Sequence, residues 1–326
     1  MVYHSVGFVH YFAGGFLRSC SSVSLYLAAF CICCLVFSHP RGGSPKTSAM
    51  PSKRQRPYLS CPEMTVRLIY DDMGCFLTLP KDYPAQLKSF GIECTIFNPF
   101  RPLLTVKQNN RDHRKIAVID GKVAFTGGIN LADEYINAIE KHGHWKDASV
   151  MVKGKAAWSF TLIFLQMWEM CTHIDEDYKR FYLWKDQECP ITAHGFVQPY
   201  ADSPMDTENV GEHVYLQILN NAKNYVYINT PYLIVDDSMV SALCLAAKSG
   251  VDVRIVTPHR WDKWLVHMTT RSYYRTLIEA GVKIYEYTNG FIHSKTFVSD
   301  DHIATVGTTN LDFRSLPEQY SHTPAP

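Results

Sequence analysis

One sequence pattern occurs twice in this chain of 326 residues and constrains its fold more than any other feature. In both copies a lysine follows a histidine by two positions, an aspartate by seven, a glycine by 14 and an asparagine by 17. The members are His113, Lys115, Asp120, Gly127 and Asn130 in the first copy, and His293, Lys295, Asp300, Gly307 and Asn310 in the second. Five residue types at matching spacings are a poor fit to chance and predict two copies of one structural unit.

Each copy has the sequence of a β-hairpin. Apolar runs at 116–119 and 296–298 precede the turn signals Asp120-Gly121 and Asp300-Asp301, and second apolar runs follow them. Side chains alternate between the two faces of a strand, so a histidine and a lysine two positions apart point the same way. The returning strand of the hairpin brings the glycine and the asparagine back beside them.

The residue types suggest an anion site. An imidazole, an ammonium group and a carboxamide that converge on one point suit a phosphate. The candidate site residues are therefore His113, Lys115 and Asn130 from the first copy, and His293, Lys295 and Asn310 from the second. Asp120 and Asp300 belong to the same motif. Each follows its histidine by seven positions, an odd number, so in an extended strand its side chain would point to the opposite face from the histidine and the lysine. We interpret both as hydrogen-bonding groups of the turn.

The sequence between the motifs alternates strands and helices, which predicts an α/β fold. Strands are expected at 66–70, 92–97, 148–152, 225–229, 251–256 and 283–287, and helices at 83–90, 156–171, 210–222, 238–248 and 265–280. Residues 66–69 resemble 253–256, so the repeat extends beyond the motifs. We expect two related halves, packed face to face around one shared site. The halves span 65–171 and 210–315, joined by a connection at 172–209 and followed by a tail at 316–326.

Residues 1–60 differ from the rest. The apolar run from Val23 to Phe37 is shorter than the roughly 20 residues of a typical membrane span, and a basic linker without acidic residues follows it. A membrane anchor, whose linker keeps the next domain cytoplasmic, and a disordered segment both fit. The apolar helix at 156–171 is expected between layers, with membrane contact as the alternative. The balance of 32 basic and 31 acidic residues argues against a general nucleic-acid binder.

The doubled motif resembles that of the phospholipase D superfamily. Further stretches are similar to bacterial cardiolipin synthases: Leu68–Gly74, Phe97–Pro102, Gly127–Tyr135, Thr230–Tyr232 and Asn310–Ser315. The resemblance extends from Thr65 to Ser315. It implies two phospholipase D-like halves and transfer of a phosphatidyl group between two phosphatidylglycerol molecules, which gives cardiolipin and glycerol.

In this family one histidine attacks phosphorus to form a phosphohistidine, while the other serves as acid and base. The resemblance assigns these roles to His113 and His293, in this order or the reverse. Lys115, Lys295, Asn130 and Asn310 would hold the phosphoryl oxygens, without a metal or cofactor. The implied partners are phosphatidylglycerol and a membrane surface, at the cytoplasmic side of the cell membrane. No nucleic-acid partner is expected, and the sequence does not predict an oligomeric state.

Some positions depart from the family pattern. Gly127 and Gly307 match it, but Thr308 replaces the usual serine. In the family an acidic residue on a later strand orients the motif histidine, and Asp147 is placed for this role in the first half. The second half ends before such a residue, so His293 is expected to lack that partner. The first half is expected to lack its opening strand and helix, which leaves both halves incomplete at the chain ends. A hydrolytic phosphodiesterase or nuclease of the superfamily, or an inactive truncated remnant, are the alternatives.

Overall fold

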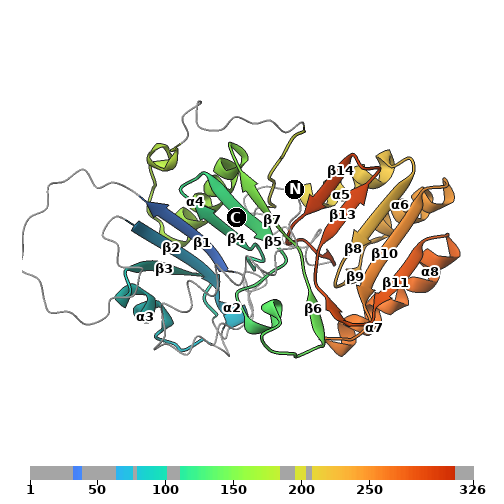
Figure 1. Cartoon of the computed structure of the whole chain (residues 1–326), viewed down its shortest axis with the longest axis horizontal. Coiled ribbons are helices and arrows are strands. Elements are labelled where there is room, and N and C mark those ends of the chain that lie inside the picture. The colour runs from blue at the N-terminus through green and yellow to red at the C-terminus, as the bar shows by residue number, and fades with distance from the viewer. Residues whose placement is uncertain are drawn as a thin grey trace, which may run out of the picture.

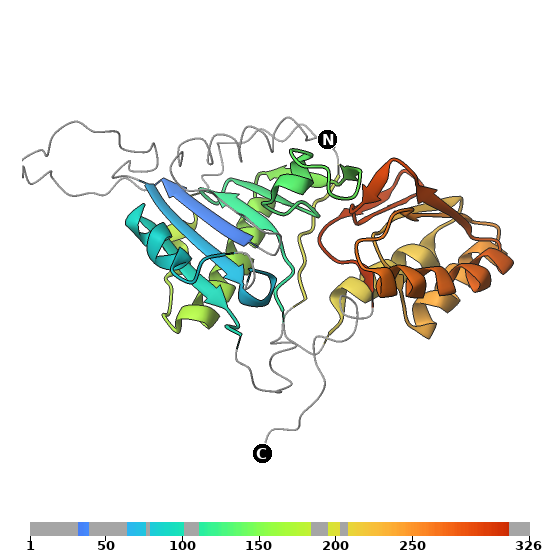
Figure 2. The same cartoon turned by 90° about the horizontal axis from the view of Figure 1, so that it is seen from below.

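The computed structural model of the chain describes residues 32–38, 64–75, 79–100, 111–183, 195–202 and 208–312. Two large β-sheets lie side by side along the long axis of the molecule (Figure 1), as the view from below also shows (Figure 2). Helices cover these sheets, which confirms the predicted α/β fold class. The division into two related halves and the domain boundaries stay predictions.

The first sheet has six strands in the order β3-β2-β1-β4-β5-β7. These are β1 (Ile32–Ser38), β2 (Met64–Asp71), β3 (Ile92–Phe97), β4 (Ile116–Ile119), β5 (Val123–Gly127) and β7 (Ser149–Lys153). The short helix α2 (Asp72–Cys75) and helix α3 (Tyr83–Ser89) lie between β2 and β3 in the chain. β2 and β3 run parallel, as strands joined by a helical crossover do.

Helix α4 (Ala156–Thr172) covers one face of the first sheet, where it contacts β1, β3, β4, β5 and β7. Its buried side chains include Phe160, Phe164, Leu165 and Trp168. The helix therefore packs as a layer of the core, as its apolar sequence predicted. Among the described residues, no helix is both long enough and apolar enough to cross a bilayer.

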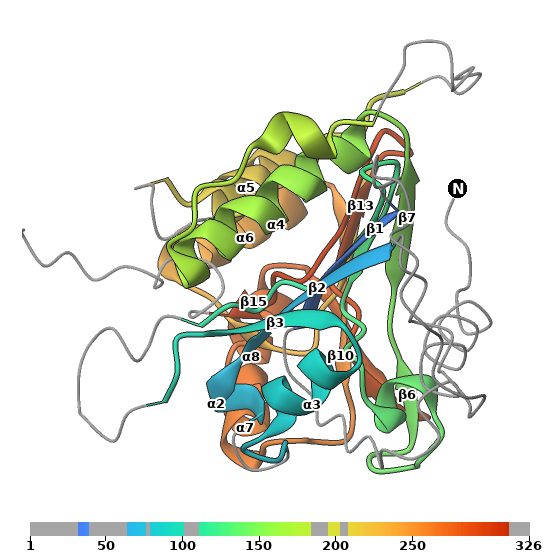
Figure 3. The ribbon, with the colours of Figure 1, turned by 90° about the vertical axis from the view of Figure 1, so that its left-hand side faces the viewer.

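The second sheet has five strands in the order β11-β10-β8-β13-β14. These are β8 (Tyr225–Asn229), β10 (Asp252–Pro258), β11 (Lys283–Tyr287), β13 (Thr296–Ser299) and β14 (Ile303–Val306). Helices α5 (Val210–Asn221) and α6 (Asp237–Lys248) pack on it, and Figure 3 shows them on the same side of the sheets as α4. In the core, the rings of Tyr215 from α5 and Phe297 from β13 stack with their centroids 4.2 Å apart.

The predicted single helix at 265–280 is wrong, because the chain forms two helices there. These are α7 (Trp264–Ser272) and α8 (Tyr274–Glu279). The hydroxyl of Thr270 accepts a hydrogen bond from the backbone of Leu233, which ties the end of α7 to the neighbouring strand β9 (Leu233–Ile234). The Tyr273 amide then donates to the carbonyl of Thr270, three residues back, and α7 ends at this tightened turn.

Strand β1 fills the central position of the first sheet, while the expectation that the first half lacks its opening strand and helix stays a prediction. β1 lies between β2 and β4 and is part of the apolar run from Val23 to Phe37, whose other residues lie outside the described ones. β1 is antiparallel to β2 and parallel to β4, whereas β8 at the corresponding place is parallel to β10 and antiparallel to β13. β1 thus runs in the opposite direction to β8.

The two motif hairpins have similar turns. Asp120 and Gly121 both have positive φ, at 53° and 63°, as do Asp300 and Asp301, at 53° and 54°. Two central residues with positive φ are the requirement of a type I′ turn, and aspartate and glycine tolerate that conformation better than most residues. The short turn signals in the sequence therefore have a structural cause.

Replacement of Phe164 by alanine tests whether α4 is a core helix. Its side chain is 1% exposed, so the cavity should lower the free energy of unfolding by about 3–5 kcal/mol. Gln166→Ala on the exposed side of the same helix serves as the control and should change it by less than about 0.5 kcal/mol. Denaturant unfolding of both variants measures the difference, and equal stabilities would contradict the packing described for α4.

Candidate active site

A short parallel pairing connects the two parts of the chain at the candidate site. Strand β6 (His144–Lys146) pairs with β12 (Gly290–Ile292), and Lys146 lies opposite Ile292. The next residue on each strand is therefore Asp147 on one side and His293 on the other. The pairing continues as the His293 amide donates to the carbonyl of Lys146 at 2.7 Å.

Asp147 and His293 form a hydrogen-bonded pair. The carboxylate Oδ2 of Asp147 lies 2.7 Å from Nδ1 of His293, and the two side chains are 2% and 7% exposed. The sequence had placed Asp147 with the histidine of the first half, and had left His293 without an acidic partner. Both expectations are wrong, because β6 carries Asp147 to the second motif rather than the first.

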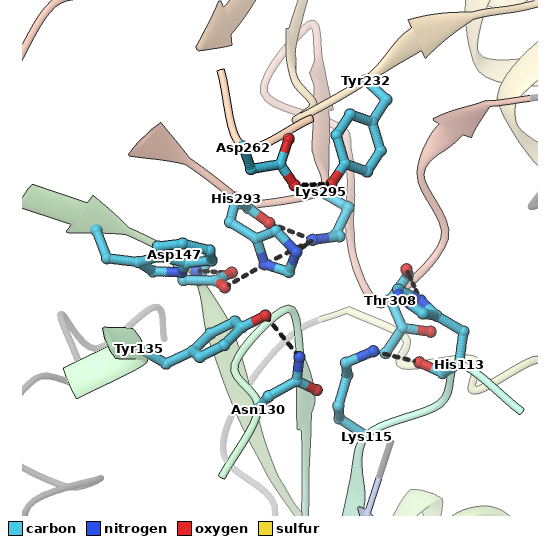
Figure 4. Close-up of polar contacts among 12 residues, drawn as sticks. His113, Lys115, Asn130, Tyr135, Asp147, Tyr232, Asp262, His293, Lys295 and Thr308 are labelled. Carbon is cyan, nitrogen blue, oxygen red and sulfur yellow. Dashed lines mark hydrogen bonds and ion pairs between the residues drawn. The ribbon is translucent and has the colours of Figure 1, made fainter. Parts of the chain in front are cut away.

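Lys295 completes a buried triad with these two residues (Figure 4). Its Nζ lies 2.8 Å from Nδ1 and 3.0 Å from Nε2 of His293, and it also reaches the backbone carbonyl of that histidine. A carboxylate only accepts and an ammonium group only donates. The consistent assignment is that Nδ1–H of His293 donates to Asp147, while Nε2 accepts from Lys295.

His113 has a different partner from His293. Its Nδ1 lies 3.2 Å from the backbone carbonyl of Thr308. Because a carbonyl oxygen only accepts, Nδ1 carries the proton and Nε2 has a lone pair. Lys115 donates from Nζ to the His113 carbonyl at 2.6 Å, so each motif lysine reaches back over its own histidine. The structure therefore brings both histidines and both lysines to one region, drawn in Figure 4.

The two predicted asparagines are buried next to these groups, with 3% and 5% exposure. Nδ2 of Asn130 donates to the hydroxyl of Tyr135 at 2.7 Å, and Nδ2 of Asn310 donates to Asp312 at 3.0 Å. Among the described residues, Oδ1 of neither asparagine has a hydrogen-bond partner. A tyrosine hydroxyl both donates and accepts, so the Asn130 amide can turn and direct its N–H groups to an anion while it keeps the contact with Tyr135.

The motif aspartates lie apart from this region. Asp300 accepts hydrogen bonds from the backbone N–H groups of residues 223, 224 and 225, at 2.7–2.9 Å. These bonds lower the pKa of Asp300 and connect the β13–β14 turn to the start of β8. The interpretation of Asp300 as a turn residue is confirmed. Asp120 occupies the equivalent turn with the same φ of 53°.

The glycines of the two motifs differ in how much space surrounds them. A Cβ on Gly127 would lie 2.3 Å from the carbonyl oxygen of Ala148, and one on Gly128 would lie 2.1 Å from Oδ1 of Asp147. Both glycines are therefore required for the approach of the segment that carries Asp147. Gly307 has open space beside it and instead donates its amide to the Lys295 carbonyl at 3.3 Å. Thr308 contributes its backbone carbonyl to His113, so its side chain is not the group in contact.

Burial and charge set the protonation states of the site. The pKa values of His113 and His293 are held well below the usual value, first by burial and then by the nearby motif lysines. Burial also lowers the pKa of Lys295 to about 7, against the opposing effect of Asp147. Burial raises the pKa of Asp147 to about 7, although Lys295 opposes it. Both histidines are therefore neutral at neutral pH before an anion binds.

Sequence reasoning missed two further contacts of the site. The rings of Tyr135 and Trp145 pack on His293, with centroids 5.3 and 5.2 Å away. Beside Lys295, the hydroxyl of Tyr232 donates to Asp262 at 2.5 Å. The resemblance includes Tyr135 and Tyr232, in the stretches Gly127–Tyr135 and Thr230–Tyr232, but the spacing of these residues gives no signal of their contacts.

Comparisons with known proteins find similar sequences. Residues 215–322 match the family model described as "Cardiolipin synthase, PLD-like domain". An uncharacterized protein of Streptococcus mutans is 52% identical over 251 residues, which are 77% of this chain and 54% of that protein. A cardiolipin synthase of Alkalihalophilus pseudofirmus is 42% identical over 252 residues, covering 77% of this chain and 50% of that enzyme.

Among solved structures, the chain resembles phosphatidylserine synthase of Haemophilus influenzae with a TM-score of 0.47 and 13% identity. The match covers 73% of this chain and 65% of that one. The chain spans about half the length of the curated relatives it matches. By its doubled motif and these sequence relatives, the chain is similar to the cardiolipin synthase-like proteins of the phospholipase D superfamily.

Proposed function

We propose that this protein is a phosphatidyltransferase that converts two phosphatidylglycerol molecules into cardiolipin and glycerol through a phosphohistidine. The observation that carries the proposal is the different environment of the two motif histidines: His113 faces a neutral carbonyl, and His293 faces a carboxylate. Its relatives named as cardiolipin synthases support the same class of substrate.

His113 suits the role of nucleophile. Its low pKa keeps the imidazole neutral, and the carbonyl of Thr308 holds the proton on Nδ1. The lone pair on Nε2 can then attack phosphorus and form a P–N bond. The P–O bond to the glycerol headgroup breaks, and a phosphatidyl-histidine remains on the enzyme.

His293 suits the role of acid and base. Asp147 accepts from Nδ1–H and stabilises the imidazolium form, as a carboxylate does behind a catalytic histidine. The charge of a bound phosphodiester further favours protonation of His293. In the first step Lys295 donates to a phosphoryl oxygen in place of Nε2, and the Nε2–H of the protonated His293 protonates the departing glycerol oxygen. In the second step Nε2 accepts the proton of the hydroxyl of a second phosphatidylglycerol, which attacks phosphorus and releases His113.

The two lysines and two asparagines supply charge and hydrogen bonds to the phosphoryl oxygens in this proposal. Lys115 and Lys295 are 6% and 2% exposed, so their charges act with little screening by solvent. The same arrangement supports hydrolysis when water replaces the second lipid. The acceptor therefore decides between a transferase and a phosphodiesterase of the superfamily.

Incubation with phosphatidylglycerol vesicles tests the reaction. The full chain should form cardiolipin and glycerol in equal amounts, and His113→Asn should lower the rate by roughly 10⁴-fold or more, because the nucleophile is lost. His213→Asn, at a side chain 63% exposed on α5, is the matched control and should retain full activity. Lipid products are separated by chromatography. Phosphatidic acid without cardiolipin would indicate hydrolysis, cleaved single-stranded DNA would indicate a nuclease, and no product from folded protein would favour the inactive alternative.

A substrate with a good leaving group separates the roles of the two histidines. Phosphatidyl-4-nitrophenol needs no proton on its leaving group, so His293→Asn should still form the covalent intermediate and then stall. Mass spectrometry should find the phosphatidyl group on His113 of this variant. His113→Asn should release no nitrophenol, and the opposite pattern would exchange the two roles.

Asp147→Asn tests the carboxylate behind His293. The amide retains an acceptor but loses the charge that stabilises the imidazolium, so the transfer rate should fall by roughly 10²–10⁴-fold.

The folded pKa of Asp147 lies near 7, above the value of 3.8 for an unperturbed group. Its contribution to stability is therefore full below about pH 4 and is lost as the pH rises to about 7. Thermal melts should show the variant gaining stability relative to wild type between pH 5 and pH 8. If the difference in melting temperature between the Asp147→Asn variant and wild type stayed the same from pH 5 to pH 8, the raised pKa of Asp147 would be contradicted.

A further inference from the structure

Helix α7 and the residues before it expose a row of large apolar side chains. Trp261, Trp264, Leu265 and Met268 are 54%, 61%, 69% and 47% exposed. Trp264, Leu265 and Met268 are spaced i, i+1 and i+4 and lie on one side of α7, and Trp261 precedes the helix in the chain. The opposite face is held by Thr270, which is 2% exposed and bonded to Leu233. We call the four exposed residues the α7 face.

The charges beside the α7 face are mostly positive. Arg260 and Lys263 are both exposed, and the only acidic residue between positions 259 and 272 is Asp262. That carboxylate accepts the hydroxyl of Tyr232 and is only partly exposed. Aromatic and aliphatic side chains flanked by cations are the composition of a helix that lies in the interface of an anionic bilayer. A second copy of the chain would place the same cations opposite each other at a symmetric contact.

The α7 face lies next to the candidate active site. Nζ of Lys263 lies 5.7 Å from the centre of the Tyr232 ring, and the charges of Lys263 and Asp262 act on His293 and Lys295. Figures 1 and 3 draw α7 along the same lower edge of the molecule as α2 and β6. Met73 of α2 and Ile139 before β6 are also exposed, at 45% and 50%. A membrane under this edge would hold lipid headgroups close to the two motif histidines.

We propose that the α7 face docks the protein on a bilayer that contains anionic phospholipid, so that a headgroup enters the site while its acyl chains stay in the membrane. This inference rests on the proposed function, since it gives the lipid substrate a route to the site. Trp264 and Leu265 would enter the boundary between headgroups and acyl chains, and Arg260 and Lys263 would meet lipid phosphates.

Flotation with vesicles of phosphatidylcholine, with or without phosphatidylglycerol, tests the surface. The full chain should float with vesicles that contain phosphatidylglycerol. Trp261→Ser, Trp264→Ser and Leu265→Ser combined should weaken this binding by about 100-fold, because three apolar side chains no longer enter the interface. The matched control removes three exposed apolar side chains elsewhere, Leu245, Ile278 and Ile303, which are 62%, 54% and 46% exposed, and should bind like wild type. Circular dichroism melts establish that both variants fold.

Charge reversal at Arg260 and Lys263 provides a second variant. Replacement of both by glutamate should weaken binding to vesicles with phosphatidylglycerol by about fivefold per cation and leave the weak binding to pure phosphatidylcholine unchanged. Equal vesicle binding by wild type and the serine variant would overturn the proposal. So would a serine variant that changes only the sedimentation mass, since the α7 face would then bind a second copy.

The outcomes separate this inference from the proposed function. Turnover of a soluble diester, bis(4-nitrophenyl) phosphate, measures the site without a membrane. If vesicle binding depends on the α7 face but neither cardiolipin nor nitrophenol forms, the proposed function fails and the docking surface stands. If cardiolipin forms while the serine variant binds vesicles as well as wild type, the function stands and the docking surface is overturned.

Discussion

The pairing of β6 with β12 is the contact on which the candidate site depends. Asp147 and His293 each follow a paired residue, so the register of three residues decides whether carboxylate and imidazole meet. The approach is close, because a Cβ on Gly290 would lie 2.2 Å from the carbonyl oxygen of His144. Gly143, with φ of 79°, turns the chain into β6. The buried hydrogen bond between Asp147 and His293 thus depends on glycines that let the two backbones come together.

This pairing also explains why two similar motifs provide different chemistry. The hairpins repeat each other down to the positive φ of their turns, and each lysine reaches the carbonyl of its own histidine. What differs is the atom opposite Nδ1, which is a carboxylate for His293 and a backbone carbonyl for His113. A charged acceptor favours the imidazolium form of His293, and a neutral acceptor leaves the imidazole of His113 neutral, as the proposed nucleophile requires. The difference lies in the surroundings of the motifs, not in the motifs.

Much of the fold follows from the sequence, because local patterns determine it. The alternation of apolar residues located β3, β8 and β11 at their observed bounds, and the turn residues located both hairpins. Parity along the strand separated Asp300 from the site residues correctly. In contrast, the partner of Asp147 depends on β6, which is only three residues long and pairs with residues more than 140 positions away. The direction of β1 likewise depends on neighbours that no local pattern specifies.

The site buries two cationic side chains next to its two histidines. Lys115 and Lys295 are both buried, and the single carboxylate in the triad is shared with His293. Burial without full compensation is what lowers the pKa of Lys295 to about 7 and keeps both histidines neutral. A phosphodiester brings one negative charge and acceptor oxygens to this place, which favours the charged lysine and the protonated His293 together. In the proposed reaction, substrate binding would therefore produce the acid for the first chemical step, in a site that does not hold it beforehand.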